Sequence, residues 1–447
     1  MTTVTEKVDE AKWGINHWKL FISLSLGYLM WGLITSIAPL TYSLAKGNPI
    51  YIALPALYPL IGTLLLPYLS DKVLGRKKTF YITLILYLVG ALIVSGAAYY
   101  ISSSSVAFLP LVLVGLLLAN IGVEGEVPTG LSYAAENFPL KWREKLLILI
   151  PNFDNIGITV AASLSLIAFS QISSPTFVME VLGFSAILVS VVLTFVRFSL
   201  PESVRWLVTK GKVNEAEKNA ELLLTKGEDA VTPMTNNRVY KIPLRTRYLF
   251  LVILGVSQYL TFGLMAYTIA DYYFSNNQYY LSTIIFVASL ATVLAGFLAS
   301  YIVDKIRTRF YVMLSYMGGT VTMLPILALV MIASSITGAY LVMFYILLAL
   351  NMLFSEFAWG ARTILEPLLF PTENRAFLIG LVRTIPIVSY AISVYLTSSI
   401  PLVDYVLLNL TLWGMGAVAS LWWFFRGYDT NLVPLEEITT ENLSQQG

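Results

Sequence analysis

Five ionisable side chains lie inside stretches of this chain that are otherwise apolar: Glu124, Asp154, Asp271, Glu356 and Arg383. A charged group that faces lipid at the middle of a bilayer costs at least about 2.5 to 3.5 kcal/mol, so we expect these groups to face a wet cavity or one another. The acids outnumber the base. A carboxylate that passes between wet and dry surroundings without a cation beside it tends to take up a proton. The pattern therefore predicts proton exchange.

We expect Glu124 and Glu356 to carry this exchange, followed by Asp154 and Asp271. Arg383 is either the fixed partner of one acid or the anchor of an anionic substrate. Two other interpretations stay open: the glutamates could lie near helix ends as gate salt bridges, and Asp271 could lie at the outer surface. The full set of predicted substrate or proton-coupling residues is Glu124, Asp154, Asp271, Glu356, Arg383, Asn152, Gln258, Tyr28 and Trp31.

The composition shows what must position these residues. The chain has 447 residues, of which 57% are hydrophobic and 12% are charged, and its mean hydropathy is +0.75. These values are typical of an integral membrane protein. Crossing the hydrocarbon takes about 20 apolar residues in a helix, and we count about twelve such stretches. They begin near Trp18, Ile50, Phe80, Ala107, Leu146, Phe177, Tyr248, Tyr280, Phe310, Ala339, Ala376 and Leu402.

The chain is also a doubled unit. Glu124, Pro139 and Arg143 recur as Glu356, Pro371 and Arg375, about 232 residues downstream in each case. Asp71 and Arg76 recur as Asp304 and Arg309 at almost the same offset. We therefore expect an all-α membrane protein with twelve transmembrane helices in two six-helix bundles, since parallel repeats are one standard way of building transporters.

Lys and Arg gather on every second break between the apolar stretches, which predicts that both termini are cytoplasmic. The expected division is a cytoplasmic N-terminal segment (1–17), a first bundle (18–198), a cytoplasmic linker (199–247), a second bundle (248–426) and a cytoplasmic tail (427–447). Within the linker, residues 214–224 read as an amphipathic helix and 225–237 as a mobile connection. The polar tail beyond Asp429 is expected to be disordered.

Several classes of function are not expected. Cys is absent, which excludes disulfides, thiolate catalysis and Cys-based metal sites, and His17 is the only histidine. The sequence contains no P-loop, metal-ligand cluster or pair of nucleophile and base, so we expect no enzyme activity, no metal and no cofactor. The net charge of +2 requires no nucleic-acid partner. The expected partners are a small-molecule substrate, protons and the lipid bilayer, with the protein as a monomer.

Three motifs lie on the breaks. Residues 69–78 read LSDKVLGRKK, residues 136–143 read ENFPLKWR, and residues 201–207 read PESVRWL. Together they resemble the signatures of the major facilitator superfamily, in its sugar-porter branch. The resemblance implies salt bridges between the two halves that close the inner gate. The predicted gate residues are Asp71, Arg76, Glu126, Glu136, Arg143, Glu202, Arg205, Asp304, Arg309 and Arg375.

The residues that hold sugar in that branch are largely replaced. Pro151 stands at its glutamine position in the fifth span, Met265 at its asparagine position in the seventh, and Leu116 at its arginine position in the fourth; only Gln258 survives. The resemblance implies a secondary active transporter in the cytoplasmic membrane. We expect it to move a sugar or similar polar metabolite by alternating access, as a proton-coupled symporter. The alternative is a carboxylate transporter that uses Arg383, and a rival of another class is an ion channel or membrane-embedded enzyme.

Overall fold

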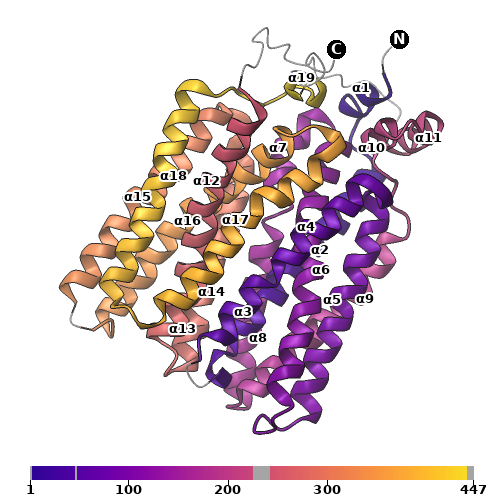
Figure 1. Cartoon of the computed structure of the whole chain (residues 1–447). Helices are drawn as coiled ribbons and strands as arrows, with labels where there is room; N and C mark the ends of the chain where they lie inside the picture. Colours follow the sequence, from indigo (N-terminus) through magenta and orange to yellow (C-terminus); the bar gives the residue numbers. More distant parts are fainter. Residues whose placement is uncertain (1–2, 46–47, 225–241, 334, 440–447) are drawn as a thin grey trace.

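The computed structural model describes residues 3–45, 48–224, 242–333 and 335–439. Every regular secondary-structure element in these residues is a helix. The chain forms two helical bundles that stand side by side, the first half in indigo to magenta and the second in orange to yellow (Figure 1). The first and last described helices, α1 (Val4–Asp9) and α19 (Leu435–Thr439), lie at one end of the molecule, which we call the termini end (Figure 1). The prediction of a two-bundle, all-α membrane protein is confirmed.

The spans begin within a few residues of their predicted starts. The first bundle consists of α2 (Ile15–Leu40), α3 (Ile50–Leu57) with α4 (Pro59–Leu69), α5 (Gly75–Tyr100), α6 (Phe108–Asn137), α7 (Leu140–Leu149) with α8 (Phe153–Gln171), and α9 (Pro175–Arg197). The second consists of α12 (Leu244–Gly263) with α13 (Ile269–Tyr273), α14 (Gln278–Ile302), α15 (Thr308–Ile332), α16 (Ala339–Leu368), α17 (Arg375–Leu396) and α18 (Leu402–Arg426).

Eleven helical runs in the described residues are long and apolar enough to cross a bilayer, and one of them makes two crossings. That run spans Ile50–Tyr100 and has 51 residues, which as a straight helix would be about 75 Å long, more than twice the hydrocarbon thickness. The chain reverses there through a π-helical turn at Ser70–Leu74, which is followed by Gly75. The φ angle of Gly75 is 81°. Gly75 suits this left-handed conformation because it has no Cβ.

The two bundles meet along a few helices. α8 of the first bundle packs against α14 of the second, and α17 packs against α3, α4 and α6. Towards the termini end, α7 packs against α14 and α16. The interface between the bundles is therefore formed by α3, α4, α6, α7 and α8 of the first half and by α14, α16 and α17 of the second.

The linker and the tail both return to the termini end (Figure 1). The linker holds α10 (Val204–Thr209) and α11 (Val213–Leu223), and Ala216, Ala220 and Leu223 are buried as the amphipathic pattern predicts. The predicted mobile connection at 225–237 lies outside the described residues.

The prediction of a disordered tail beyond Asp429 is wrong for the described part. Residues 435–439 form α19 (Leu435–Thr439), where Leu435 and Ile438 are buried. Val433 is buried as well. These three apolar side chains hold the tail against the protein, and the polar composition around them hid that signal.

Candidate functional site

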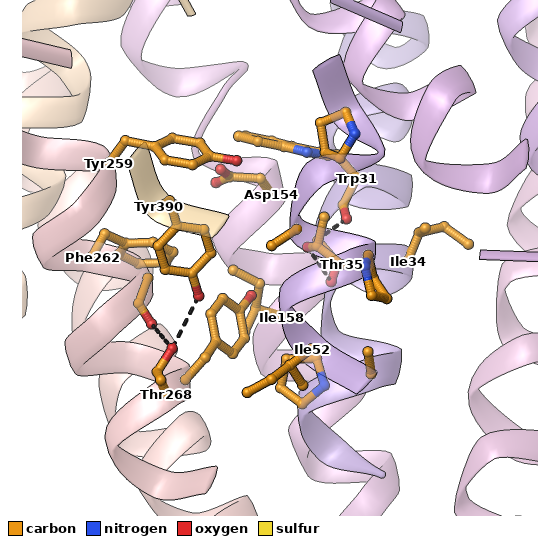
Figure 2. A pocket seen from close by; sticks show the side chains of 18 of the residues that line it. Trp31, Ile34, Thr35, Ile52, Asp154, Ile158, Tyr259, Phe262, Thr268 and Tyr390 are labelled. Carbon is orange, nitrogen blue, oxygen red and sulfur yellow. Dashed lines mark hydrogen bonds between the residues drawn. The ribbon is translucent and has the colours of Figure 1, made fainter. Parts of the chain in front are cut away.

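A cavity of about 110 Å³ lies between the two bundles. Residues of both halves line it, and Figure 2 shows Trp31, Thr35, Asp154 and Ile158 on one side, with Tyr259, Phe262, Thr268 and Tyr390 on the other. The principal lining residues are Trp31, Thr35, Ile52, Leu116, Asn120, Asp154, Asn155, Ile158, Gln258, Tyr259, Phe262, Tyr267, Thr268, Asp271, Glu356, Trp359 and Tyr390.

The cavity lies in the part of the membrane domain that is farther from the termini end. On α2, which starts at that end, the lining residues are confined to the later part, from Trp31 to Pro39. On α6, which runs the other way, they are Leu116 and Asn120, in the earlier part of the helix. The cavity therefore sits between the middle and the far end of the spans.

Carboxylates from both bundles form the charged part of the wall. Asp154 of the first bundle and Asp271 and Glu356 of the second line the cavity, and none of the described lining residues is Lys, Arg or His. Glu356 Oε2 accepts a hydrogen bond of 2.7 Å from the side-chain Nδ2 of Asn155. Asp154 Oδ1 accepts a hydrogen bond of 2.5 Å from the backbone N–H of Asn155. The lining favours a neutral or cationic solute over an anion.

Asp271 differs from the other two acids. Its side chain is 1% exposed, and neither carboxylate oxygen has a hydrogen-bond partner. The alternative interpretation that placed Asp271 at the outer surface is therefore wrong.

Glu124 and Arg383 lie behind the wall rather than on it. Glu124 Oε1 accepts a hydrogen bond of 2.6 Å from Arg383 Nε, which joins α6 of the first bundle to α17 of the second. The guanidinium carbon of Arg383 lies 5.3 to 5.9 Å from the ring centroids of Trp359, Trp31 and Tyr259, which line the cavity. Of the two predicted roles for Arg383, the structure shows the fixed partner of an acid.

The two equivalent glutamates make equivalent connections. Glu124, near the middle of α6, contacts α17, and Glu356, near the middle of α16, contacts α8 through Asn155. Each glutamate therefore reaches across to the other bundle. Both are buried in mid-helix, which removes the alternative that they lie near helix ends as gate residues.

The expectation of a single buried base was wrong. Arg362 is also fully buried, on α16, where it pairs with Glu366 at 2.7 Å. It also donates a hydrogen bond of 2.7 Å to Oε1 of Gln258, a predicted site residue that lines the cavity. The spacing of Arg362 and Glu366, four residues apart on one helix, was a signal that could have identified the pair.

Two further predicted site residues, Asn152 and Tyr28, do not line the cavity. Asn152 donates to the Val293 carbonyl oxygen at 3.1 Å and accepts from Asn155 at 3.2 Å, so it serves the packing of α8 against α14. Tyr28 is buried and donates to the Val127 carbonyl oxygen at 3.2 Å. Trp31, by contrast, lines the cavity, and its ring lies 5.8 Å from that of Trp359 in the other bundle.

At the termini end, Glu136 is the centre of a buried ion-pair network. It pairs with Arg76 of its own bundle at 2.8 Å and with Arg375 of the second bundle at 2.9 Å. Asp71 pairs with Arg76 at 2.5 Å and accepts a bond of 2.8 Å from the Phe377 amide on α17. This network ties the two bundles together on that side.

A second network joins both chain termini. Asp9, at the end of α1 (Val4–Asp9), pairs with Arg143 and, at 2.8 Å, with Arg205. Arg205 also pairs with Glu436 of α19 at 2.8 Å. Glu202 instead caps the start of α5, because its carboxylate accepts from the amides of Arg76 and Lys77. Asp9 and Glu436 were not singled out by the sequence, since nothing in either terminal segment marks its partner.

Three further predicted gate residues contribute little or nothing to a link between the halves. Glu126 pairs with Arg197 of its own bundle, so it does not link the halves. Arg309 pairs with Asp429 at 3.2 Å, which holds the tail to the second bundle. Asp304 does bridge the bundles, to Lys145 at 3.4 Å, but both side chains are partly exposed and such pairs contribute little.

Comparisons with known proteins agree with this geometry. The model of the Major Facilitator Superfamily matches residues 20–385. Polyol transporter 5 of Arabidopsis thaliana is 32% identical over 179 residues, covering 40% of this chain and 30% of the relative. The putative niacin/nicotinamide transporter NiaP of Bacillus subtilis is 29% identical over 165 residues, covering 36% of each protein. The chain thus spans about a third of the length of the curated relatives it matches.

Among solved structures, the proton:xylose symporter XylE bound to 6-bromo-6-deoxy-D-glucose superposes with a TM-score of 0.77 at 16% identity, covering 95% of this chain and 98% of the other. The inward open conformation of XylE from Escherichia coli gives a TM-score of 0.65 at 16% identity, covering 95% and 99%. At this identity the likeness shows the shared fold.

Proposed function

This chain belongs to the major facilitator superfamily, and from that premise we propose that it is a secondary active transporter of a small polar solute. The solute class that fits is a sugar, a polyol or a similar metabolite, moved by alternating access with a proton as the coupling ion. Family membership agrees with the expectation of a transporter rather than an enzyme. The sugar-porter resemblance agrees with the polyol transporters among the relatives.

One observation carries the proposal: the cavity lies between the bundles and is bounded at the termini end by an ion pair and a hydrogen bond that join them. Arg375 to Glu136 and Phe377 to Asp71 are the bridging contacts. A site that both bundles share can open to either side when they rock against each other. Breaking this network would open the cavity toward the termini end.

The termini end is proposed to be cytoplasmic, because the Lys and Arg residues of the breaks gather there. The multi-pass protein would then reside in the cell membrane with its cavity on the outer side and its inner gate closed.

Proton coupling is proposed to run through the two bonds that cross the centre. Protonation of Glu124 removes the charge that holds Arg383, and protonation of Glu356 changes its bond to Asn155. Each event loosens one connection between the bundles and so links proton binding to their movement. The carboxylate-lined wall gives no support to the anion alternative, in which Arg383 would hold the substrate.

The test is uptake by the purified protein in liposomes. We expect saturable uptake of a polyol or sugar that a pH gradient, acid outside, drives above equilibrium. Uptake that rises linearly with concentration and ignores the gradient would contradict the proposal. Channel-like behaviour of that kind would favour the rival class.

A further inference from the structure

The carboxylate of Asp271 is a buried charge on the cavity wall for which the transport cycle proposed above has no use. It lies on α13, 1% exposed, with both oxygens free of hydrogen-bond partners. Leaving a carboxylate in this state is costly, because burial removes its hydration without a compensating bond. Either a proton or a donor group of an incoming solute removes this cost.

Three tyrosine hydroxyl groups near Asp271 are engaged elsewhere. Tyr390 shares a hydrogen bond of 3.2 Å with Thr268, Tyr272 donates to the Val394 carbonyl oxygen at 2.5 Å, and Tyr51 shares a bond of 2.9 Å with Thr41. All three tyrosines are near enough to Asp271 to interact with it electrostatically. These three tyrosines thus lie near the carboxylate, while their hydroxyl groups bond to other partners and its oxygens stay unpaired.

The chemistry of the missing group follows from these surroundings. A divalent cation needs six or more oxygen ligands for calcium or a rigid octahedron for magnesium, and the described residues contain no group of three or more potential metal ligands. An ammonium group needs one negative charge and is attracted to the faces of aromatic rings. Phe262, Tyr267 and Tyr390 line the same cavity as Asp271.

We propose that Asp271 and the surrounding rings form a subsite for a protonated amine, so that the transported solute is a polyol-like or sugar-like molecule that carries an amino group. This inference rests on the proposed transport function and narrows its substrate class. Among the other polar lining residues, Gln258, Asn120 and Asn155 offer hydrogen bonds to the hydroxyl groups of the same solute. The amine end then lies toward Asp271.

The test compares solute pairs that differ only by an amine in place of a hydroxyl group: D-glucosamine with D-glucose, and 1-amino-1-deoxysorbitol with sorbitol. Binding to the purified protein is measured by calorimetry, and uptake is measured in liposomes. A charge-assisted hydrogen bond is worth roughly 1.5 to 3 kcal/mol, so the amine of a pair should bind about tenfold more tightly or better. Asp271→Asn should abolish that difference, and Asp271→Glu should restore part of it.

Asp404→Asn serves as the matched control, because Asp404 is an exposed carboxylate at the start of α18. It should leave the amine preference intact. Unchanged binding of the neutral solutes by Asp271→Asn would show that the variant is folded. Equal affinity for both members of each pair would overturn the amine subsite, as would an amine preference that survives in Asp271→Asn.

Two further outcomes separate this inference from the proposed function. If neutral polyols or sugars are transported and the amines are not, the subsite proposal fails while the transporter proposal stands. If Asp271→Asn keeps the amine preference but loses proton-driven accumulation, the carboxylate is a proton site and the subsite proposal is again wrong. Absence of saturable uptake for every solute would overturn both.

Discussion

Glu124 and Arg383 form a buried ion pair that crosses the interface between the two bundles, with Oε1 and Nε 2.6 Å apart. Neither side chain is more than 1% exposed, so the pair lies in surroundings where water screens little. The guanidinium group also lies close to three aromatic rings of the cavity wall. A change in the charge of Glu124 would therefore be felt both at the interface and at the cavity.

The first prediction concerns the charge of Glu124. Glu124→Gln keeps the shape of the side chain but removes the charge that a proton would neutralise. We expect exchange of labelled solute across liposome membranes to continue, while accumulation driven by a pH gradient falls to near equilibrium. Glu373→Gln, an exposed change in the short 3₁₀ turn directly before α17, should leave both activities unaltered. Full accumulation by Glu124→Gln would show that its titration is not the coupling step.

The second prediction concerns the energy of the pair. Removing one partner of a buried ion pair leaves an uncompensated charge and costs roughly 3 to 5 kcal/mol. Arg383→Gln should therefore lower the thermal unfolding temperature more than the double variant Glu124→Gln/Arg383→Gln does. Arg383→Lys should recover only part of the lost unfolding temperature. A lysine ammonium group cannot both replace the bond from Nε to Glu124 and stack on the neighbouring aromatic rings. Additive losses in the double variant would indicate that the two groups are not energetically coupled.

The third prediction concerns the termini end. Glu136→Gln weakens the pairs with Arg76 and Arg375 and should shift the protein toward the conformation that is open on that side. The natural chain has no cysteine, so Ser132→Cys gives a single reporter, one helical turn before Glu136 and fully buried. We expect a water-soluble thiol reagent to label it several-fold faster in Glu136→Gln than in the parent. Equal labelling rates would argue against a gate at this position.

The fourth prediction concerns pH and the tail. Burial alone would raise the pKa of Glu436, but the neighbouring Arg205 guanidinium outweighs it and lowers that pKa to about 2. A group with a depressed folded-state pKa stabilises the protein above its ordinary pKa of roughly 4.3, and that contribution is lost as the pH falls toward 2. Because Glu436 is half-exposed, the effect should be small.

Thermal unfolding measured from pH 7 to pH 3 checks this. The parent should unfold at a slightly higher temperature than Glu436→Gln at pH 7, and the gap should narrow steadily below about pH 4.5. Glu437→Gln is the matched neighbour for comparison. A gap that is constant across this range would show that the ion pair with Arg205 does not stabilise the tail.

The sequence was sufficient for the fold because apolar stretches of membrane length leave few alternatives, and the repeat of Glu124 at Glu356 located the division into halves. It also identified Asp154, Asp271 and Glu356 as residues that require a cavity. It could not predict which helix faces meet. The burial of Arg362 beside Gln258, and the positions of Asn152 and Tyr28 away from the cavity, depend on how each helix is rotated in the bundle. The contacts of Asp9 and Glu436 with Arg205 depend on where two distant chain ends dock.

The most direct measurement is uptake by purified protein in liposomes with an imposed pH gradient, acid outside, for matched polyol, sugar and amine solutes. The account predicts saturable uptake that exceeds equilibrium in the parent and only equilibrates in Glu124→Gln and Glu356→Gln. Accumulation that persists undiminished in both variants would contradict the claim that carboxylates bridging the two bundles couple proton binding to transport.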